Sequence, residues 1–207
     1  MAPIKCFLLV PTEKCRRYLR RYSRGYGEPS VCKINGSYHN AMTFFEEIRE
    51  IKGAEAWEKI GGSADPPRWD PRWPIRCECG YLFGTADEFQ VFDEHLWKRT
   101  DTGEEMTLRD APDGAMWDAY WFHEQKEWCG EDGLSIICKV PFGHEWMIDG
   151  KASNCTMPGD TVHRCWVRHG VPPNLTVDKN GKTCKAGAGS IQAPKWHGFL
   201  RNGMLVP

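Results

Sequence analysis

Two closely spaced cysteines, in the run Cys77-Glu78-Cys79-Gly80, are the residues best suited to chemistry in this chain of 207 residues. A Cys-x-Cys-Gly step places two thiolates on one tight turn, which is the geometry of a zinc knuckle. Structural zinc takes four cysteine or histidine ligands at the corners of a tetrahedron, and distant segments often share them. Downstream candidates are Cys155, His163, Cys165, His169, Cys184 and His197. We expect one structural zinc site formed by Cys77, Cys79, Cys155 and Cys165, with His163 and Cys184 as substitutes.

The ten cysteines also allow two other interpretations. Residues 1–6 contain no apolar core of the length that a secretory signal peptide needs, so we expect synthesis in the cytosol and reduced thiols. Scattered reduced cysteines would then serve as small buried apolar residues. Disulfides remain an alternative for a particle that leaves the cell, such as a virion.

The run from His163 to His169 invites a catalytic interpretation. If the run is a strand, His163, Cys165 and His169 share one face, and a histidine could activate the Cys165 thiol as a nucleophile. No orienting acid and no nucleophile-elbow motif accompany them. We therefore keep a thiol-dependent or metal-dependent hydrolase as an alternative, and expect metal binding or packing at Cys165.

Basic residues are concentrated at the N-terminus. The whole chain has a net charge of −1, whereas residues 1–26 carry seven basic side chains against Glu13 alone. Arginine neutralises phosphates and tyrosine stacks on bases, so an arginine- and tyrosine-rich arm predicts a nucleic-acid-binding module as an alternative function. The candidate contacts are Arg16, Arg17, Arg20, Arg21 and Arg24. A basic strand that docks on an acidic protein surface is the other interpretation.

The ten tryptophans are the second unusual feature of the composition. Buried or interfacial anchoring is their usual role, because indoles bury a large area. An aromatic platform that binds sugar is the alternative.

The elements that must position these residues are mostly strands. Residues 39–60 predict an amphipathic helix, with Met42, Phe45 and Ile48 on one side, and Gly61 ends it. Residues 63–74 form a proline- and tryptophan-rich connector. From residue 75 onward, short apolar runs alternate with Asp-Gly and Asn-Gly turns. We therefore predict a mainly β (α+β) fold, a small antiparallel sandwich or partial barrel stapled by zinc, divided into residues 1–62, 63–74 and 75–207.

The chain also resembles a family of bacteriophage and prophage proteins of unknown function. The stretches that carry the resemblance are Arg76–Tyr81, Asp101–Asp118, Trp146–Gly150, His163–Gly170 and Trp196–Gly203, the last being Trp-His-Gly-Phe-Leu-Arg-Asn-Gly. This resemblance implies a phage context and supplies no mechanism.

We expect a phage-encoded structural or interaction protein without turnover, either a minor virion component or an accessory protein directed at the host. Its expected partners are other phage or host proteins, with nucleic acid as a further candidate through the basic arm. The longest apolar runs are too short to cross a membrane. The expected location is the host cytoplasm or the virion, without export by a signal peptide.

Overall fold

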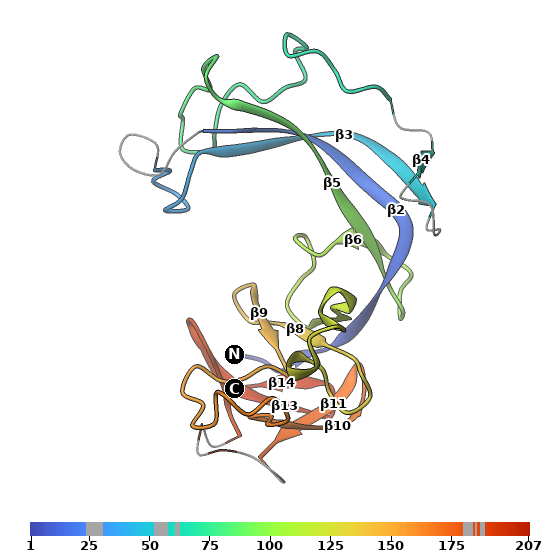
Figure 1. Ribbon diagram of the computed structural model, residues 1–207, viewed down its shortest axis with the longest axis vertical. Helices are drawn as coiled ribbons and strands as arrows, with labels where there is room; N and C mark the ends of the chain where they lie inside the picture. The colour runs from blue at the N-terminus through green and yellow to red at the C-terminus, as the bar shows by residue number, and fades with distance from the viewer. Residues whose placement is uncertain (24–30, 52–57, 61–62, 180–183, 185, 187–188) are drawn as a thin grey trace. The chain divides into compact units, whose positions relative to one another are not determined.

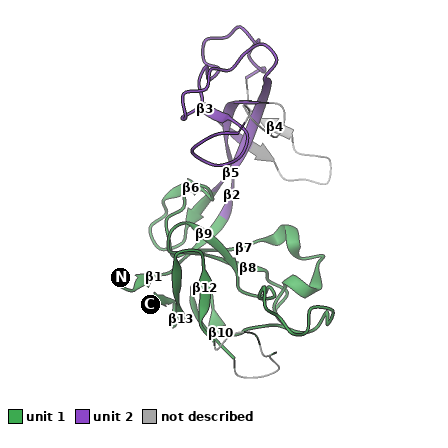
Figure 2. Ribbon diagram, turned by 90° about the vertical axis from the view of Figure 1, so that its left-hand side faces the viewer, with its two compact units in different colours: residues 1–10, 97–207 green, residues 11–96 purple. Residues whose placement is uncertain are grey.

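The computed structural model describes residues 1–23, 31–51, 58–60, 63–179, 184, 186 and 189–207 (Figure 1). The prediction of a mainly β fold is confirmed, since 46% of the chain is strand and 3% is helix, and the sheets do not close into a barrel. The chain forms two compact units (Figure 2). Unit 1 contains residues 1–10 and 97–207, and unit 2 contains residues 11–96. This division differs from the segments predicted above, because residues 1–10 pack with the C-terminal part of the chain.

Unit 2 is built on long antiparallel strands. The strands are β2 (Phe7–Tyr22), β3 (Asn40–Ile51), β4 (Glu58–Ile60) and β5 (Glu88–Arg99). They follow the order β4-β3-β2, and β5 also pairs with β2. The pairing of β2 with β3 runs from Lys14 opposite Arg49 to Tyr22 opposite Asn40, with a register shift between Arg17 and Tyr18.

The predicted helix at residues 39–60 is wrong, because residues 40–51 form strand β3. The apolar residues of this segment do have the 3.6-residue spacing of a helix, but contacts with the neighbouring strand stabilise the extended conformation more. In the β2–β3 register, Arg16 lies opposite Glu47 and Arg17 lies opposite Glu46. Opposite charges in directly facing positions stabilise a strand pair, and this contribution depends on the partner strand rather than on local sequence. Residues 52–57 of the predicted helix lie outside the described residues.

The proline-rich stretch at residues 63–74 packs within unit 2. Trp73 is buried, its indole N–H donates to the carbonyl of Pro67 over 2.9 Å, and its ring meets Phe89 edge-to-face at 5.1 Å. Trp69, in contrast, is 83% exposed. Only one of the two tryptophans therefore holds this stretch in place.

Unit 1 contains two sheets and a hairpin. The first 3 residues of β2 run parallel to β7 (Ala115–Asp118), which continues antiparallel through β8 (Ile136–Val140) to β9 (His144–Met147). The second sheet has the order β1-β14-β13-β12, and β10 pairs with β11 as a hairpin. The bounds of these and the remaining elements are β1 (Ile4–Lys5), β6 (Glu105–Thr107), η1 (Tyr120–Phe122), η2 (Lys126–Trp128), β10 (Val167–Val171), β11 (Asn174–Asp178), β12 (Ile191–Ala193), β13 (Trp196–Arg201) and β14 (Met204–Val206).

The N-terminal residues belong to the core of unit 1. Cys6, Phe7 and Leu9 are buried, at 2%, 5% and 1% exposure. Cys6 packs with Met116 and Leu205 in one apolar cluster, while Phe7 and Leu9 join a second cluster. Cys6, Phe7 and Leu9 therefore belong to the core of unit 1 rather than to a free arm.

Candidate metal centres

Four side chains of unit 2 converge to form what we call the knuckle cluster, which consists of Cys32, His39, Cys77 and Cys79. Their ligand atoms all lie within 4.8 Å of one another. Cys32, His39 and Cys77 are buried, and Cys79 is half-buried. Three cysteines and one histidine are a donor set that tetrahedral zinc sites use.

Two distances in this cluster can be compared with the edges of a tetrahedral zinc site. With zinc–sulfur bonds of about 2.3 Å, the sulfur–sulfur edge of the tetrahedron is about 3.8 Å. The Sγ atoms of Cys32 and Cys77 are 3.9 Å apart. The Sγ atom of Cys79 lies 3.1 Å from Nδ1 of His39, the distance of a thiol–imidazole hydrogen bond. The Cys32–Cys77 distance thus matches a tetrahedral edge, whereas the Cys79–His39 distance is shorter than the edge of about 3.6 Å that a bound zinc ion would set.

Two tight turns hold the cysteines of this cluster. In the first, the N–H of Gly36 donates to the carbonyl of Cys32 over 2.8 Å; in the second, the N–H of Gly80 donates to the carbonyl of Cys77 over 2.9 Å. Gly36 and Gly80 have φ values of +68° and +96°. This left-handed region favours glycine, so the glycine that follows Cys79 is a requirement of the turn.

The first turn also prepares Cys32 to bind a metal. Backbone N–H groups of Asn35 and Ile34 hydrogen-bond to the sulfur and lower the pKa of Cys32 from 9.0 to about 7. Hydrogen bonds to the charged form of a thiol favour the thiolate, which is the form that binds metal.

His39 is oriented by its neighbours. Its ring stacks on Tyr81 with centroids 3.9 Å apart and planes 2° apart. The Tyr81 hydroxyl in turn lies 3.3 Å from the carboxylate of Asp87, which accepts the N–H of Gly84 over 2.7 Å. Such a surrounding shell fixes the direction of a ligating imidazole.

Unit 1 contains the second group, the C-terminal cluster, formed by Cys155, His163, Cys165 and Cys184. Their ligand atoms also lie within 4.8 Å of one another. The Sγ atoms of Cys165 and Cys184 are 3.7 Å apart, and Nε2 of His163 lies 3.6 Å from the Sγ of Cys165. These distances are again close to the edges of a tetrahedral zinc site.

Backbone N–H groups point at the sulfurs of the C-terminal cluster. The N–H of Met157 donates to Cys155 over 3.3 Å, and the N–H of Ala186 donates to Cys184 over 3.3 Å. The N–H of Ala152 donates to Cys165 over 3.2 Å. Each of these N–H groups stabilises negative charge on the sulfur that it contacts, so several thiolates can lie close together around one bound cation.

The thiols of this cluster differ in pKa. Burial raises the pKa of Cys184, but backbone N–H groups of Thr156 and Ala186 outweigh it and lower the value to about 5. Burial, together with the neighbouring cysteines, raises the pKa of Cys165 to about 11. Cys165 is also 0% exposed. A buried thiol with a raised pKa is a poor nucleophile, which argues against catalysis by Cys165.

The single site predicted from Cys77, Cys79, Cys155 and Cys165 needs correction, because the structure assigns the two pairs to different clusters in different units. Each pair is completed by residues of its own unit. His163 and Cys184, expected as substitutes, lie in the C-terminal cluster. His163 reaches it from a loop, since the strand β10 begins only at Val167.

Sequence reasoning missed Cys32 and His39. The signal available was their spacing, a cysteine and a histidine separated by a short stretch containing Asn35-Gly36, which predicts a tight turn. His169, considered as a ligand, instead pairs with Asp178 at 3.1 Å. All ten cysteines are free thiols in the structure.

Two of the arginines proposed to bind nucleic acid are buried and already engaged. Arg17 is 6% exposed and pairs with Asp93 at 3.0 Å and with Glu46 at 3.4 Å. Arg21 is 7% exposed, donates to the carbonyl of Gly84 and stacks over Phe89 at 4.3 Å.

The remaining arm arginines differ in their surroundings. Arg20 is half-buried, and its guanidinium donates to Asn40 over 2.8 Å and to the Tyr38 hydroxyl over 2.5 Å. Arg16 is half-buried in β2, opposite Glu47, and Arg24 lies outside the described residues. The engaged guanidinium groups hold unit 2 together, which leaves them unavailable to phosphates.

Each cluster supplies four protein donors, so a tetrahedral ion bound there would have no open position for water. Catalytic zinc keeps such a position, and structural zinc does not. Both clusters are therefore able to hold a metal ion in a structural role. Among the described residues, no helix is both long and apolar enough to cross a bilayer. Comparisons with protein-family models, with curated proteins and with solved structures gave no match.

Proposed function

We propose that this protein binds two zinc ions, one in each cluster, and that both ions are structural. The observation that carries the proposal is the convergence of two Cys3His sets, each with all four ligand atoms within 4.8 Å. Soft thiolates favour zinc over magnesium or calcium, and a tetrahedral arrangement of three sulfurs and one imidazole suits zinc.

Each ion has a clear structural task in its unit. The knuckle cluster lies in a small apolar cluster, where Cys32 and Cys77 pack with Phe83. The C-terminal cluster gathers segments that carry little regular structure, since residues 151–166 contain no strand or helix. A metal ion that joins such segments contributes folding free energy directly.

We further propose that the protein works by binding other proteins rather than by turnover. Three large apolar side chains stand out from the surface next to the knuckle cluster in sequence, Ile34 at 57%, Ile75 at 68% and Leu82 at 58% exposure. These exposed side chains are the contacts that we propose for a partner protein. The resemblance to phage proteins makes a virion component or a host-directed accessory protein the role that we propose for this binding.

Metal analysis tests the zinc proposal. Purified protein should contain about two zinc ions per chain, as expected for two four-ligand sites. Cys77→Ser and Cys155→Ser should each reduce the content by one ion, and the double variant should bind none. Cys129→Ser is the matched control, because Cys129 is buried outside both clusters and should leave the metal content unchanged.

Two results would contradict this proposal. One is metal-free protein that melts at the same temperature after zinc is added. The other is a Cys77→Ser variant with a full metal content. The binding role has its own test, which is mass spectrometry of purified phage particles together with a tagged pull-down from infected cells. Absence from both, combined with hydrolytic activity that Cys165→Ala abolishes in protein that still folds, would favour the enzyme instead.

A further inference from the structure

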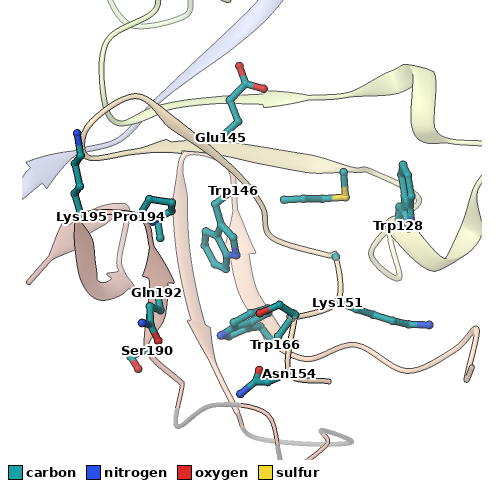
Figure 3. Close-up of a pocket in the computed structure, with 15 residues that line it drawn as sticks. Trp128, Glu145, Trp146, Lys151, Asn154, Trp166, Ser190, Gln192, Pro194 and Lys195 are labelled. Atoms are coloured by element: carbon teal, nitrogen blue, oxygen red, sulfur yellow. The ribbon is translucent and has the colours of Figure 1, made fainter. Parts of the chain in front are cut away.

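Unit 1 contains a cavity of about 940 Å³ outside both metal clusters, shown in Figure 3. This volume lies in the range of small-molecule sites. Its walls come from the end of η2, from β9, from the loop after β9 and from β12. From these walls we propose that the cavity binds a neutral oligosaccharide.

The apolar part of the cavity is made of tryptophans. Trp146 and Trp166 meet edge-to-face, with ring centroids 5.5 Å apart and planes at 83°, and Trp128 lines the cavity further along (Figure 3). Trp146 and Trp166 are half-buried and pack against the main apolar core of unit 1. Anchored indoles of this kind present rigid apolar faces, on which the C–H face of a sugar ring can stack.

The polar part of the cavity is uncommitted. Asn154, Ser190 and Gln192 line it, and their side chains have no hydrogen-bond partner among the described residues. Amides and hydroxyls both donate and accept, which matches the hydroxyl groups of a sugar. An apolar peptide in this place would cover these groups without satisfying them, and that is costly.

The charges around the cavity argue against an ionic ligand. The amino group of Lys151 already donates to the carbonyl of Pro158 over 2.7 Å, which leaves Lys195 as the one exposed cation among the lining residues. A phosphate group would need more than this single cation. The carboxylate of Glu145 is directed away from the indoles (Figure 3). A quaternary ammonium group bound on the aromatic faces would therefore have a lysine as its charged neighbour rather than a carboxylate.

Calorimetric titration and saturation-transfer NMR on the full chain test this proposal. The probes are tetrasaccharides of glucose, galactose and N-acetylglucosamine. At least one should bind with a Kd between micromolar and about 10 mM, the range of weak specific recognition. Trp146→Ala should weaken that binding about tenfold or more, as expected for a buried aromatic contact. Gln192→Ala should weaken it severalfold. Trp69→Ala, at an exposed tryptophan of unit 2, should have no effect.

Several outcomes would overturn the proposal. They are the absence of binding by all three sugars at about 10 mM, unchanged sugar binding in folded Trp146→Ala, and binding of tetramethylammonium, inorganic phosphate or a proline-rich peptide that is tighter than that of every sugar and is weakened by Trp146→Ala. If Trp146→Ala fails to fold, Gln192→Ala decides, because Gln192 is an exposed side chain whose loss does not disturb the core. The metal proposal is unaffected by any of these results, since none of the cavity residues is a cluster ligand.

Discussion

Replacing Cys32 by alanine tests the knuckle cluster at the ligand that the sequence reasoning did not find. Cys32 is 1% exposed, and its sulfur lies 3.9 Å from that of Cys77. The variant keeps only three of the four donors that a tetrahedral ion needs, and the sulfur of Cys77 loses its nearest neighbour in the cluster. We expect the loss of one metal ion per chain.

The expected loss of stability follows from comparing two terms. Removing a buried thiol by itself costs about 1–2 kcal/mol, on the scale of other small core truncations. Structural zinc in small domains contributes roughly 10–16 kcal/mol of binding free energy at neutral pH, as much as the whole stability of a typical domain. Even a fraction of this is several kcal/mol. For a chain of this size, each kcal/mol corresponds to about 2–4 °C of melting temperature, so a loss of about 3–5 kcal/mol in Cys32→Ala should lower the melting temperature by roughly 6–20 °C.

Cys15→Ala is the matched control, because Cys15 is equally buried, at 3% exposure, in the same unit but outside the cluster. It should keep both ions and lose only a few degrees. Metal content is measured by elemental analysis, and melting by calorimetry with and without a chelator. The reasoning is refuted if Cys32→Ala keeps its full metal content and melts like Cys15→Ala, or if the chelator does not change the melting temperature of the wild type.

Three further predictions concern single residues. Arg17→Met should lower the free energy of unfolding in urea by about 1–3 kcal/mol, because it removes a buried guanidinium from two half-buried carboxylates. Arg72→Met, at an exposed arginine, should lower it by about 1 kcal/mol or less, and equal losses would contradict the burial argument. Gly80→Ala should lower the free energy of unfolding by about 1–2 kcal/mol and weaken metal binding, because Gly80 has a φ of +96°. Gly159 lies in open space without a positive φ, so Gly159→Ala should be nearly neutral in the same melting assay. In metal-stripped protein that circular dichroism shows to be still folded, Cys184 should be alkylated readily at pH 6, where its pKa of about 5 leaves it ionised, and labelling should fall as the pH drops through about 5. The same depressed pKa means that its contribution to stability is complete above the usual thiol value of 9.0 and is lost as the pH falls through about 5; labelling that begins only near pH 9 would refute the shift.

Local patterns in the sequence determined much of the strand content. The Asp-Gly and Asn-Gly turns and the short apolar runs after residue 75 predicted a mainly β fold, and strands β5, β13 and β14 lie in that part of the chain. These signals are reliable because a turn or a short alternating run depends on a few neighbouring residues. The Cys77–Cys79 knuckle was readable for the same reason, since both ligands and their glycine lie within four positions.

The tertiary structure decided which strand partner each segment has, and this changed the interpretation of the basic arm and of residues 39–60. Glu46 and Glu47 have the spacing of a solvent-facing side of a helix, but they lie opposite Arg17 and Arg16 on β2. Neither segment alone specifies that pairing. The pairing of the two segments is stabilised by contacts between residues about thirty positions apart in the chain. The local pattern of either segment does not show these contacts.

The tertiary structure also decided how the candidate metal ligands are grouped. The sequence predicted Cys77, Cys79, Cys155 and Cys165 as candidate ligands by residue type and spacing, but residue type carries no information about which distant pair completes a site. That depends on which loops the folded units bring within 4.8 Å, and the fold brings Cys32 and His39 to one pair and His163 and Cys184 to the other. Four donor atoms must lie close enough together to coordinate the same ion. Which four do so in each cluster is therefore fixed only by the packing of each unit.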